Sequence, residues 1–299
     1  MEYLQLGSSD LVVSRIGLGC NNVGARIGRA ETRAVVEAAL ECGITFFDTA
    51  ELYGGGESER LLGEILEGRR DEVVLATKFG WGSEHGRGSA AVVRTSIEGS
   101  LERLRTEYVD LYYLHKPDPE TPIAETLTAL DELVREGTVR AIGCSNFSAV
   151  QLAEADQVAR ELGVTRFTVL QNHYNLLERG DDADVLPLCR ELGVAYIPYF
   201  PLASGLLTGK YRRGQPAPEG SRLAGRELEE ERLARVERLE RFAAERGHTL
   251  LELAISALVS TPEIGSVIAG ATRPEQVRAN AAAAGWRLSA EELVALAAL

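Results

Sequence analysis

Four ionisable side chains stand where they could act together on a single proton. Asp48 follows the apolar run ITFF, Lys78 follows VVLAT, His115 follows VDLYYL, and Tyr53 lies in the segment just beyond Asp48. A tyrosine has a reference pKa near 10, so it needs a neighbour that favours its ionised form before it can exchange a proton at neutral pH. We expect the ammonium group of Lys78 to lower the pKa of Tyr53 by roughly 2 to 3 units.

This constellation predicts the protonation of a carbonyl oxygen. Asp48 would keep Lys78 charged and oriented. Tyr53 would donate the proton while His115 hydrogen-bonds the same oxygen, so that both stabilise a developing alkoxide. Each residue alone has a simpler interpretation, because Asp48 and Lys78 could form an ordinary salt bridge and the other two could be structural. Their occurrence after successive apolar runs favours the catalytic interpretation.

The elements that must bring these residues together follow an alternating pattern. After a hairpin pattern, YLQL and LVVS, short β-rich runs alternate with helical segments, giving eight strand and helix units from RIGLG to IGSVIAG and the helix after it. Near-continuous apolar strands of this kind are buried on both faces. The sequence therefore predicts the α/β class and a (β/α)8 TIM barrel with an N-terminal β-hairpin. A doubly wound open sheet is the alternative.

Local sequence signals support this order of helices and strands. Glycines that can adopt the left-handed cap conformation follow the helical patterns at Gly43, Gly137, Gly163, Gly193 and Gly247. After the seventh strand we expect one long helical stretch, preceded by a Pro- and Gly-rich loop over residues 211–225. That loop would lie on the face where such barrels bind ligands.

Composition bounds the class of protein. A chain of 299 residues with 45% hydrophobic and 26% charged residues is consistent with one barrel domain over residues 1–299. The formal net charge of −13 argues against nucleic acid and anionic membranes as partners. Neither a secretory leader nor a long apolar run is visible, which predicts a cytoplasmic protein. The oligomeric state stays open.

The cysteines and histidines are dispersed along the chain. Neither the cysteines, at 20, 42, 144 and 189, nor the histidines, at 85, 115, 173 and 248, have the spacing of a zinc site or of a disulfide framework. We therefore assign no metal ion to this sequence.

Motifs along essentially the whole chain resemble the aldo-keto reductase family. They are DTAELYGGGESERLLGEIL from Asp48, LATKFG around Lys78, YYLHKPDP around His115, GCSNF from Gly143, LQNHYN around Gln171 and PLASGLLTGKY from Pro201. The resemblance implies a catalytic tetrad of Asp48, Tyr53, Lys78 and His115, with Tyr53 as the general acid. It implies reversible reduction of aldehydes or ketones with NADPH.

The resemblance also implies where the cofactor binds. Ser145, Asn146 and Gln171 match positions that hold the nicotinamide carboxamide, and Tyr199 matches the aromatic residue that stacks on the nicotinamide ring. Positions along the pyrophosphate are matched by Leu202, Ser204, Gly205, Leu207 and Lys210, and those around the adenosine end by Gly270, Arg273, Gln276 and Asn280. The fork of donors on Arg273 suits a 2′-phosphate, which favours NADPH and leaves NADH possible. Ala279 and Phe200 depart from the residues common in the family.

The substrate pocket and two rival functions complete the predictions. We expect Leu52, Trp81, Tyr113 and Asn172 to line the pocket, whose small-molecule carbonyl substrate the sequence does not identify. One rival is an aldolase in which Lys78 forms a Schiff base. The other is a nicotinamide-binding, redox-sensing regulatory subunit with little turnover.

Overall fold

Parallel strands lie at the centre of the fold. The computed structural model describes residues 1–81 and 86–299. Within these residues an eight-stranded parallel sheet has the order β10-β3-β4-β5-β6-β7-β8-β9. The strands are β3 (Ile16–Gly19), β4 (Phe46–Asp48), β5 (Val74–Phe79), β6 (Val109–Leu114), β7 (Val139–Ser145), β8 (Val169–His173), β9 (Ala195–Tyr199) and β10 (Val267–Gly270). His85 lies outside the described residues.

The sheet curls into a nearly closed barrel. The last strand, β10, pairs with the first, β3, from Val267 opposite Ile16 to Gly270 opposite Gly19. On its other side, a parallel bridge between Tyr196 and Ile264 brings β9 beside the segment that leads into β10. Arg15 strengthens this closure, because its guanidinium donates to the backbone carbonyls of Val259 and Ile264. The predicted TIM barrel is confirmed, and the alternative of an open doubly wound sheet is excluded.

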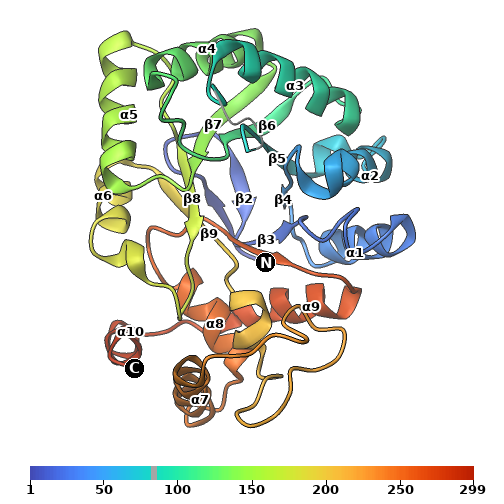
Figure 1. Cartoon of the computed structure of the whole chain (residues 1–299), viewed down its shortest axis with the longest axis vertical. Coiled ribbons are helices and arrows are strands. Elements are labelled where there is room, and N and C mark those ends of the chain that lie inside the picture. Colours follow the sequence, from blue (N-terminus) through green and yellow to red (C-terminus); the bar gives the residue numbers. More distant parts are fainter. Residues whose placement is uncertain (82–85) are drawn as a thin grey trace.

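Helices form a ring around the strands (Figure 1). They are α1 (Arg29–Glu41), α2 (Glu57–Ile65), α3 (Ala90–Leu104), α4 (Ile123–Glu136), α5 (Ala149–Leu162), α6 (Val185–Leu192), α7 (Glu230–Ala244), α8 (Leu250–Val259), α9 (Pro274–Ala282) and α10 (Ala290–Ala297). Short 3₁₀ segments are η1 (Tyr53–Gly56), η2 (Arg70–Glu72), η3 (Gly180–Asp182), η4 (Ala203–Thr208) and η5 (Ala283–Gly285). In the described part of the chain, none of the helices combines the length and apolarity needed to cross a bilayer.

Helix ends follow the predicted glycine signals. Gly137, Gly163 and Gly193 end α4, α5 and α6 in the left-handed conformation, with φ of 79°, 65° and 68°. The long helical stretch expected after β9 is present as α7, which ends before Gly247 as predicted, but the sequence did not predict the second helix, α8. The chain forms η4, a loop, and then two helices, because Gly247 turns the backbone at φ 76° and a capping box between Thr249 and Glu252 starts α8.

The predicted hairpin closes one end of the barrel. Strand β1 (Tyr3–Gln5) pairs antiparallel with β2 (Val12–Ser14), and Figure 1 shows β2 in the middle of the ring. The buried Leu6, Leu11 and Val13 of this segment belong to the apolar cluster of the barrel interior. The opposite end, where the carboxyl ends of the strands meet, is left for ligands.

Candidate active site

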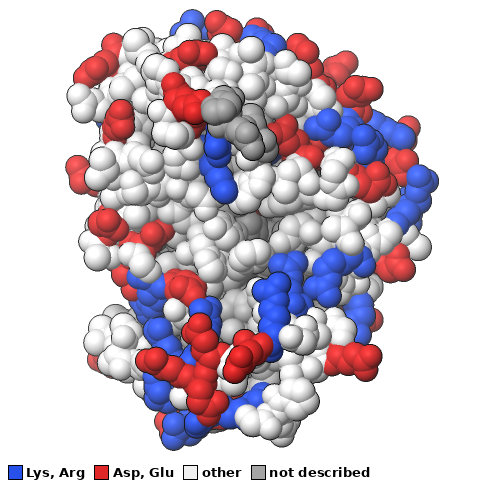
Figure 2. Space-filling view, in the orientation of Figure 1, with Lys and Arg blue, Asp and Glu red and all other residues white. Residues whose placement is uncertain are grey.

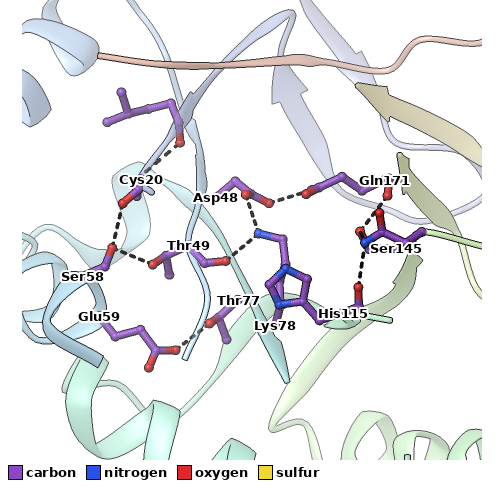
Figure 3. A network of polar contacts seen from close by, with 12 residues as sticks. Cys20, Asp48, Thr49, Ser58, Glu59, Thr77, Lys78, His115, Ser145 and Gln171 are labelled. Carbon is purple, nitrogen blue, oxygen red and sulfur yellow. Dashed lines mark hydrogen bonds and ion pairs between the residues drawn. The ribbon is translucent and has the colours of Figure 1, made fainter. Parts of the chain in front are cut away.

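A buried ion pair joins the ends of two neighbouring strands. Lys78 Nζ donates to Asp48 Oδ1 at 2.5 Å and to the backbone carbonyl of Thr49 at 2.7 Å. Gln171, in the middle of β8, donates from Nε2 to Asp48 Oδ2 at 2.9 Å, a contact that crosses the barrel (Figure 3). Both carboxylate oxygens of Asp48 are thereby bound, and the carboxylate is fixed between a cation and an amide.

The ammonium group of Lys78 is held in its charged form. Burial alone lowers the pKa of Lys78, but the interactions with Asp48 and Tyr53 outweigh it, so the pKa is raised above its ordinary value. A Schiff-base lysine needs a neutral amine with a depressed pKa. The electrostatics of this lysine therefore argue against the aldolase.

Tyr53 lies on the segment between β4 and α2, against the same lysine. Lys78 Nζ is 5.1 Å from the centroid of the Tyr53 ring, and that ring meets the His115 ring edge-on at 6.2 Å. Burial raises the pKa of Tyr53, and the nearby ammonium of Lys78 offsets this only in part. The expected net lowering of this pKa is wrong, because loss of water around the phenol outweighs the effect of the lysine. Tyr53 is a fully protonated hydroxyl at neutral pH.

His115 presents a neutral imidazole to the same space. Burial, followed by the charges of Lys78 and Lys116, lowers its pKa to about 2. Its Nδ1 is buried and has no hydrogen-bond partner among the described residues. The Trp81 ring lies 4.7 Å from the imidazole, and Lys116 Nζ lies 3.6 Å from the centroid of Trp81. A neutral imidazole in this setting can donate a hydrogen bond without carrying charge.

These side chains meet at one cavity of about 520 Å³ at the carboxyl end of the barrel. Asp48, Tyr53 and His115 line it, while Lys78 lies fully buried beneath them. The other predicted residues that line it are Leu52, Trp81, Ser145, Asn146, Gln171, Tyr199, Leu202, Ser204, Gly205, Lys210, Gly270, Arg273, Gln276 and Asn280. A proton donor, a neutral hydrogen-bond donor and an ammonium thus surround a space large enough for an organic ligand.

Comparison with known proteins decides the family. The sequence model of the Aldo/keto reductase family matches residues 15–299. The chain belongs to this family. The match spans the whole barrel, from the residue before β3 to the helices after β10.

Three relatives of this chain have different names. A "Probable voltage-gated potassium channel subunit beta" from Oryza sativa subsp. japonica is 37% identical over 296 residues, which cover 94% of this chain and 90% of the relative. "Aldo-keto reductase YhdN" from Bacillus subtilis is 35% identical, covering 98% and 91% of the two chains. An "NADH-specific methylglyoxal reductase" from Escherichia coli is 34% identical, covering 97% and 95%.

At one end of the cavity, polar groups and an aromatic ring suit the nicotinamide that aldo-keto reductases use. Ser145 Oγ donates to the carbonyl of Gln171 at 2.7 Å, and Tyr199 donates its hydroxyl proton to Asn146 Oδ1 at 2.8 Å. Asn146 holds this position with a φ of 62°, in the left-handed region. His173 stacks on Tyr199 at 5.3 Å between ring centroids. The tyrosine ring is therefore supported from outside while it lines the cavity.

The rest of the cavity is cationic in an acidic protein. Arg26, Lys210, Arg222 and Arg273 line it, and none has an ion pair with a carboxylate in residues 1–81 and 86–299. Figure 2 shows Lys and Arg side chains gathered around the hollow of this face. Asp48, neutralised by Lys78, is the one acidic residue among the described residues that line the cavity. The residues that line this cavity thus fit a ligand that carries several negative charges.

Apart from the buried Lys78, three predicted residues do not line the cavity. Asn172 is wrong as a pocket residue, since its amide donates to the carbonyl of Phe147 at 2.9 Å and to Asp181 at 2.8 Å. Successive residues of a strand point to opposite faces, so Gln171 takes the inner face and Asn172 the outer one. Tyr113 is fully buried in the barrel interior, and Leu207 packs in the apolar cluster of η4, α7 and α8.

Sequence reasoning missed the residues that cover the cationic end. Arg222 comes from the predicted long loop and donates to Asn22 Oδ1 at 2.8 Å, while Arg26 donates to the carbonyl of Gly220 at 3.3 Å. The loop therefore lies across the cavity and touches the segment after β3. The excess of arginines in this loop was the available signal. Cys20 also lines the cavity, but burial raises the pKa of its thiol, which makes it unreactive.

Proposed function

We propose that this protein reduces aldehydes or ketones to alcohols with NADPH, in a reversible reaction. The arrangement of Asp48, Lys78, Tyr53 and His115 around one cavity carries the proposal. NADPH supplies the hydride when it is bound. Ser145, Asn146, Gln171 and Tyr199 would hold its nicotinamide end, as the resemblance to the family implies.

The proton in this proposal comes from the hydroxyl of Tyr53. Lys78 faces the same phenol, so its charge stabilises the phenolate that remains after the proton has left. Asp48 keeps Lys78 charged and fixed. The neutral imidazole of His115 donates a hydrogen bond to the substrate oxygen, which stabilises the negative charge that develops there.

The charge of the cavity supports NADPH over NADH. A dinucleotide pyrophosphate carries about two negative charges, and a 2′-phosphate adds about 1.5 to 2 more. Arg26, Lys210, Arg222 and Arg273 offer a matching number of cations without carboxylate partners in the described part of the chain. The name of the Escherichia coli relative specifies NADH, so this preference needs its own test.

The test of the reaction is the substitution of Tyr53 by phenylalanine. Tyr53→Phe removes the proton donor but keeps the ring, so we expect carbonyl reduction to fall by at least about 10³-fold, in keeping with the loss of a general acid. The affinity for NADPH, measured by quenching of intrinsic fluorescence, should stay within a few-fold. NADPH oxidation with a panel of small aldehydes and ketones provides the rate. Retained activity in the variant would rule out this role of Tyr53.

A second substitution tests the cofactor preference. Arg273→Ala should weaken NADPH binding by about 10- to 100-fold, because a hydrogen-bonded charge pair contributes about 1.5–3 kcal/mol, and should weaken NADH binding much less. Arg29→Ala is the matched control, since Arg29 lies on α1 and pairs with Glu64 away from the cavity. Equal losses of affinity for the two cofactors in Arg273→Ala would show that Arg273 does not bind the 2′-phosphate.

The potassium channel subunit among the relatives favours a second candidate, the redox-sensing regulatory subunit. Single-turnover measurement separates the two. An enzyme transfers hydride to at least one carbonyl of the panel at about 1 s⁻¹ or faster, the lower end of ordinary turnover numbers. Tight NADPH binding with far slower transfer to every carbonyl would favour the regulatory subunit.

A further inference from the structure

Thr49, beside Lys78, makes a hydrogen bond with each of its polar atoms. Its backbone N–H donates to the carbonyl of Ala76 at 2.9 Å, and its own carbonyl accepts a proton of Lys78 at 2.7 Å. Its side-chain oxygen lies 2.8 Å from the hydroxyl of Ser58 (Figure 3). The orientation of the carbonyl that receives Lys78 therefore depends on a contact with a residue outside the tetrad.

Ser58 connects three segments below the cavity. It is fully buried in the first turn of α2, and its hydroxyl donates to the backbone carbonyl of Cys20 at 3.1 Å. A hydroxyl has a single proton, so Thr49 is the donor in the contact between the two hydroxyls. Cys20 in turn donates its N–H to the carbonyl of Asp48 at 2.9 Å. Ser58 thus ties α2 to the ends of β3 and β4.

The loop that Ser58 closes is the one that carries Tyr53. The proton donor is followed by Gly54, Gly55 and Gly56, which all have left-handed backbone angles, with φ of 60°, 67° and 90°. Three glycines in a row offer no side chains to fix the loop, and glycine is the residue with most backbone freedom. The bond between Thr49 and Ser58, nine residues apart, joins the two ends of this loop.

The next residue anchors the helix that presents Ser58. Glu59 is fully buried, accepts from the hydroxyl of Thr77 at 2.5 Å and pairs with Arg103 Nε at 2.6 Å. Thr77 precedes Lys78 on β5, and Arg103 belongs to α3. The start of α2 is therefore fixed to the strand of the catalytic lysine, so Ser58 has a rigid base.

We propose that Ser58 is a positioning residue for carbonyl reduction. It acts through Thr49 to hold Lys78 and the loop that carries Tyr53 in their positions relative to each other. This inference rests on the proposed function. Ser58 does not line the cavity among the described residues, so it acts without touching a ligand. Loss of its hydroxyl removes no member of the tetrad, but it leaves the Thr49 carbonyl that holds Lys78, and the loop that carries Tyr53, less well fixed.

The first experiment is Ser58→Ala. We expect kcat to fall about 10- to 100-fold, the scale of small misplacements in an active site, while the NADPH dissociation constant stays within about threefold of the wild-type value. The pH above which reduction declines should move upward, because a less well fixed Lys78 offsets the burial of Tyr53 less. Ser256→Ala is the matched control, since Ser256 is equally buried on α8 and bonds the carbonyl of Ala283. A merely structural serine would lower the melting temperature without moving the pH profile.

A double-mutant cycle with Thr49→Val decides whether the two hydroxyls act through each other. Valine keeps the shape of threonine, so Thr49→Val alone should lower kcat and shift the pH profile as Ser58→Ala does, and it gives the same test if the serine variant does not fold. The double variant should lose no more activity than either single variant. Additive losses, or a wild-type pH profile in both single variants, would overturn the proposal. An active Tyr53→Phe variant would instead overturn the proposed function itself.

Discussion

At the scale of single residues, burial sets the protonation states of the site. The pKa values of His115 and Tyr53 both move away from neutral pH. That of His115 falls to about 2, and that of Tyr53 rises above its ordinary value near 10, so both side chains are uncharged at pH 7. The sequence predicted which residues meet, because Asp48, Lys78 and His115 each follow a recognisable apolar run and Tyr53 comes five residues after Asp48. It did not predict these protonation states, because the water that a side chain loses depends on neighbours such as Trp81 that come from elsewhere in the chain.

The pH dependence of carbonyl reduction follows from these shifts. A histidine with a lowered pKa stays neutral from about pH 5 upward, and a tyrosine with a raised pKa stays protonated to above its usual value near 10. The plot of kcat/KM against pH should therefore be flat between about pH 5 and 9 and decline only at higher pH. An inflection near pH 6.5 that disappears in His115→Gln would show that His115 titrates and would contradict this assignment. Stopped-flow mixing gives the rates at the extremes of pH.

At the scale of elements, small residues in the strands make room for large ones inside the barrel. Gly143 of β7 faces Tyr113, and a Cβ added at Gly143 would lie 2.7 Å from that ring and 2.9 Å from the carbonyl of Val169. The number and order of strands could be predicted from the alternation of apolar runs. The pairing of a glycine with a particular aromatic ring could not, because it depends on the register between strands.

Replacing this glycine should therefore weaken the fold. We expect Gly143→Ala to lower the free energy of unfolding by about 1–3 kcal/mol, the usual cost of overpacking a core. Gly180→Ala is the control, because Gly180 has an ordinary φ and no atom within 4 Å of its added Cβ. Urea denaturation of the two variants gives the comparison. Equal midpoints for the two would mean that the barrel interior adjusts freely around Tyr113.

At the scale of the whole molecule, charge is distributed unevenly. The chain carries a net charge of −13, yet its main cavity is lined by cations such as Arg26 and Arg222 that lack carboxylate partners among the described residues. The acidic total could be counted from the sequence. The cationic cavity could not, because Arg222 reaches Asn22 from 200 residues away, and loop shape is not visible in a local pattern.

Cofactor binding should accordingly depend on salt. Raising the NaCl concentration from about 0.05 to 0.5 M shortens the range of electrostatic attraction severalfold, so we expect the dissociation constant of NADPH to increase by about 10-fold or more and that of NADH to increase less. Titrations followed by fluorescence at several salt concentrations provide the slopes. A dissociation constant for NADPH that does not change with salt would mean that the cavity cations do not meet its phosphates.

The pairing of β3 with β10 bears on how the protein is made in the cell. Ile16 finds its partner Val267, and Arg15 the carbonyls of Val259 and Ile264, only after almost the whole barrel has left the ribosome. Until then β3 exposes an unpaired edge, and such edges pair readily with other chains. A nascent chain that ends before β10 therefore exposes an edge of β3 with which other chains can pair.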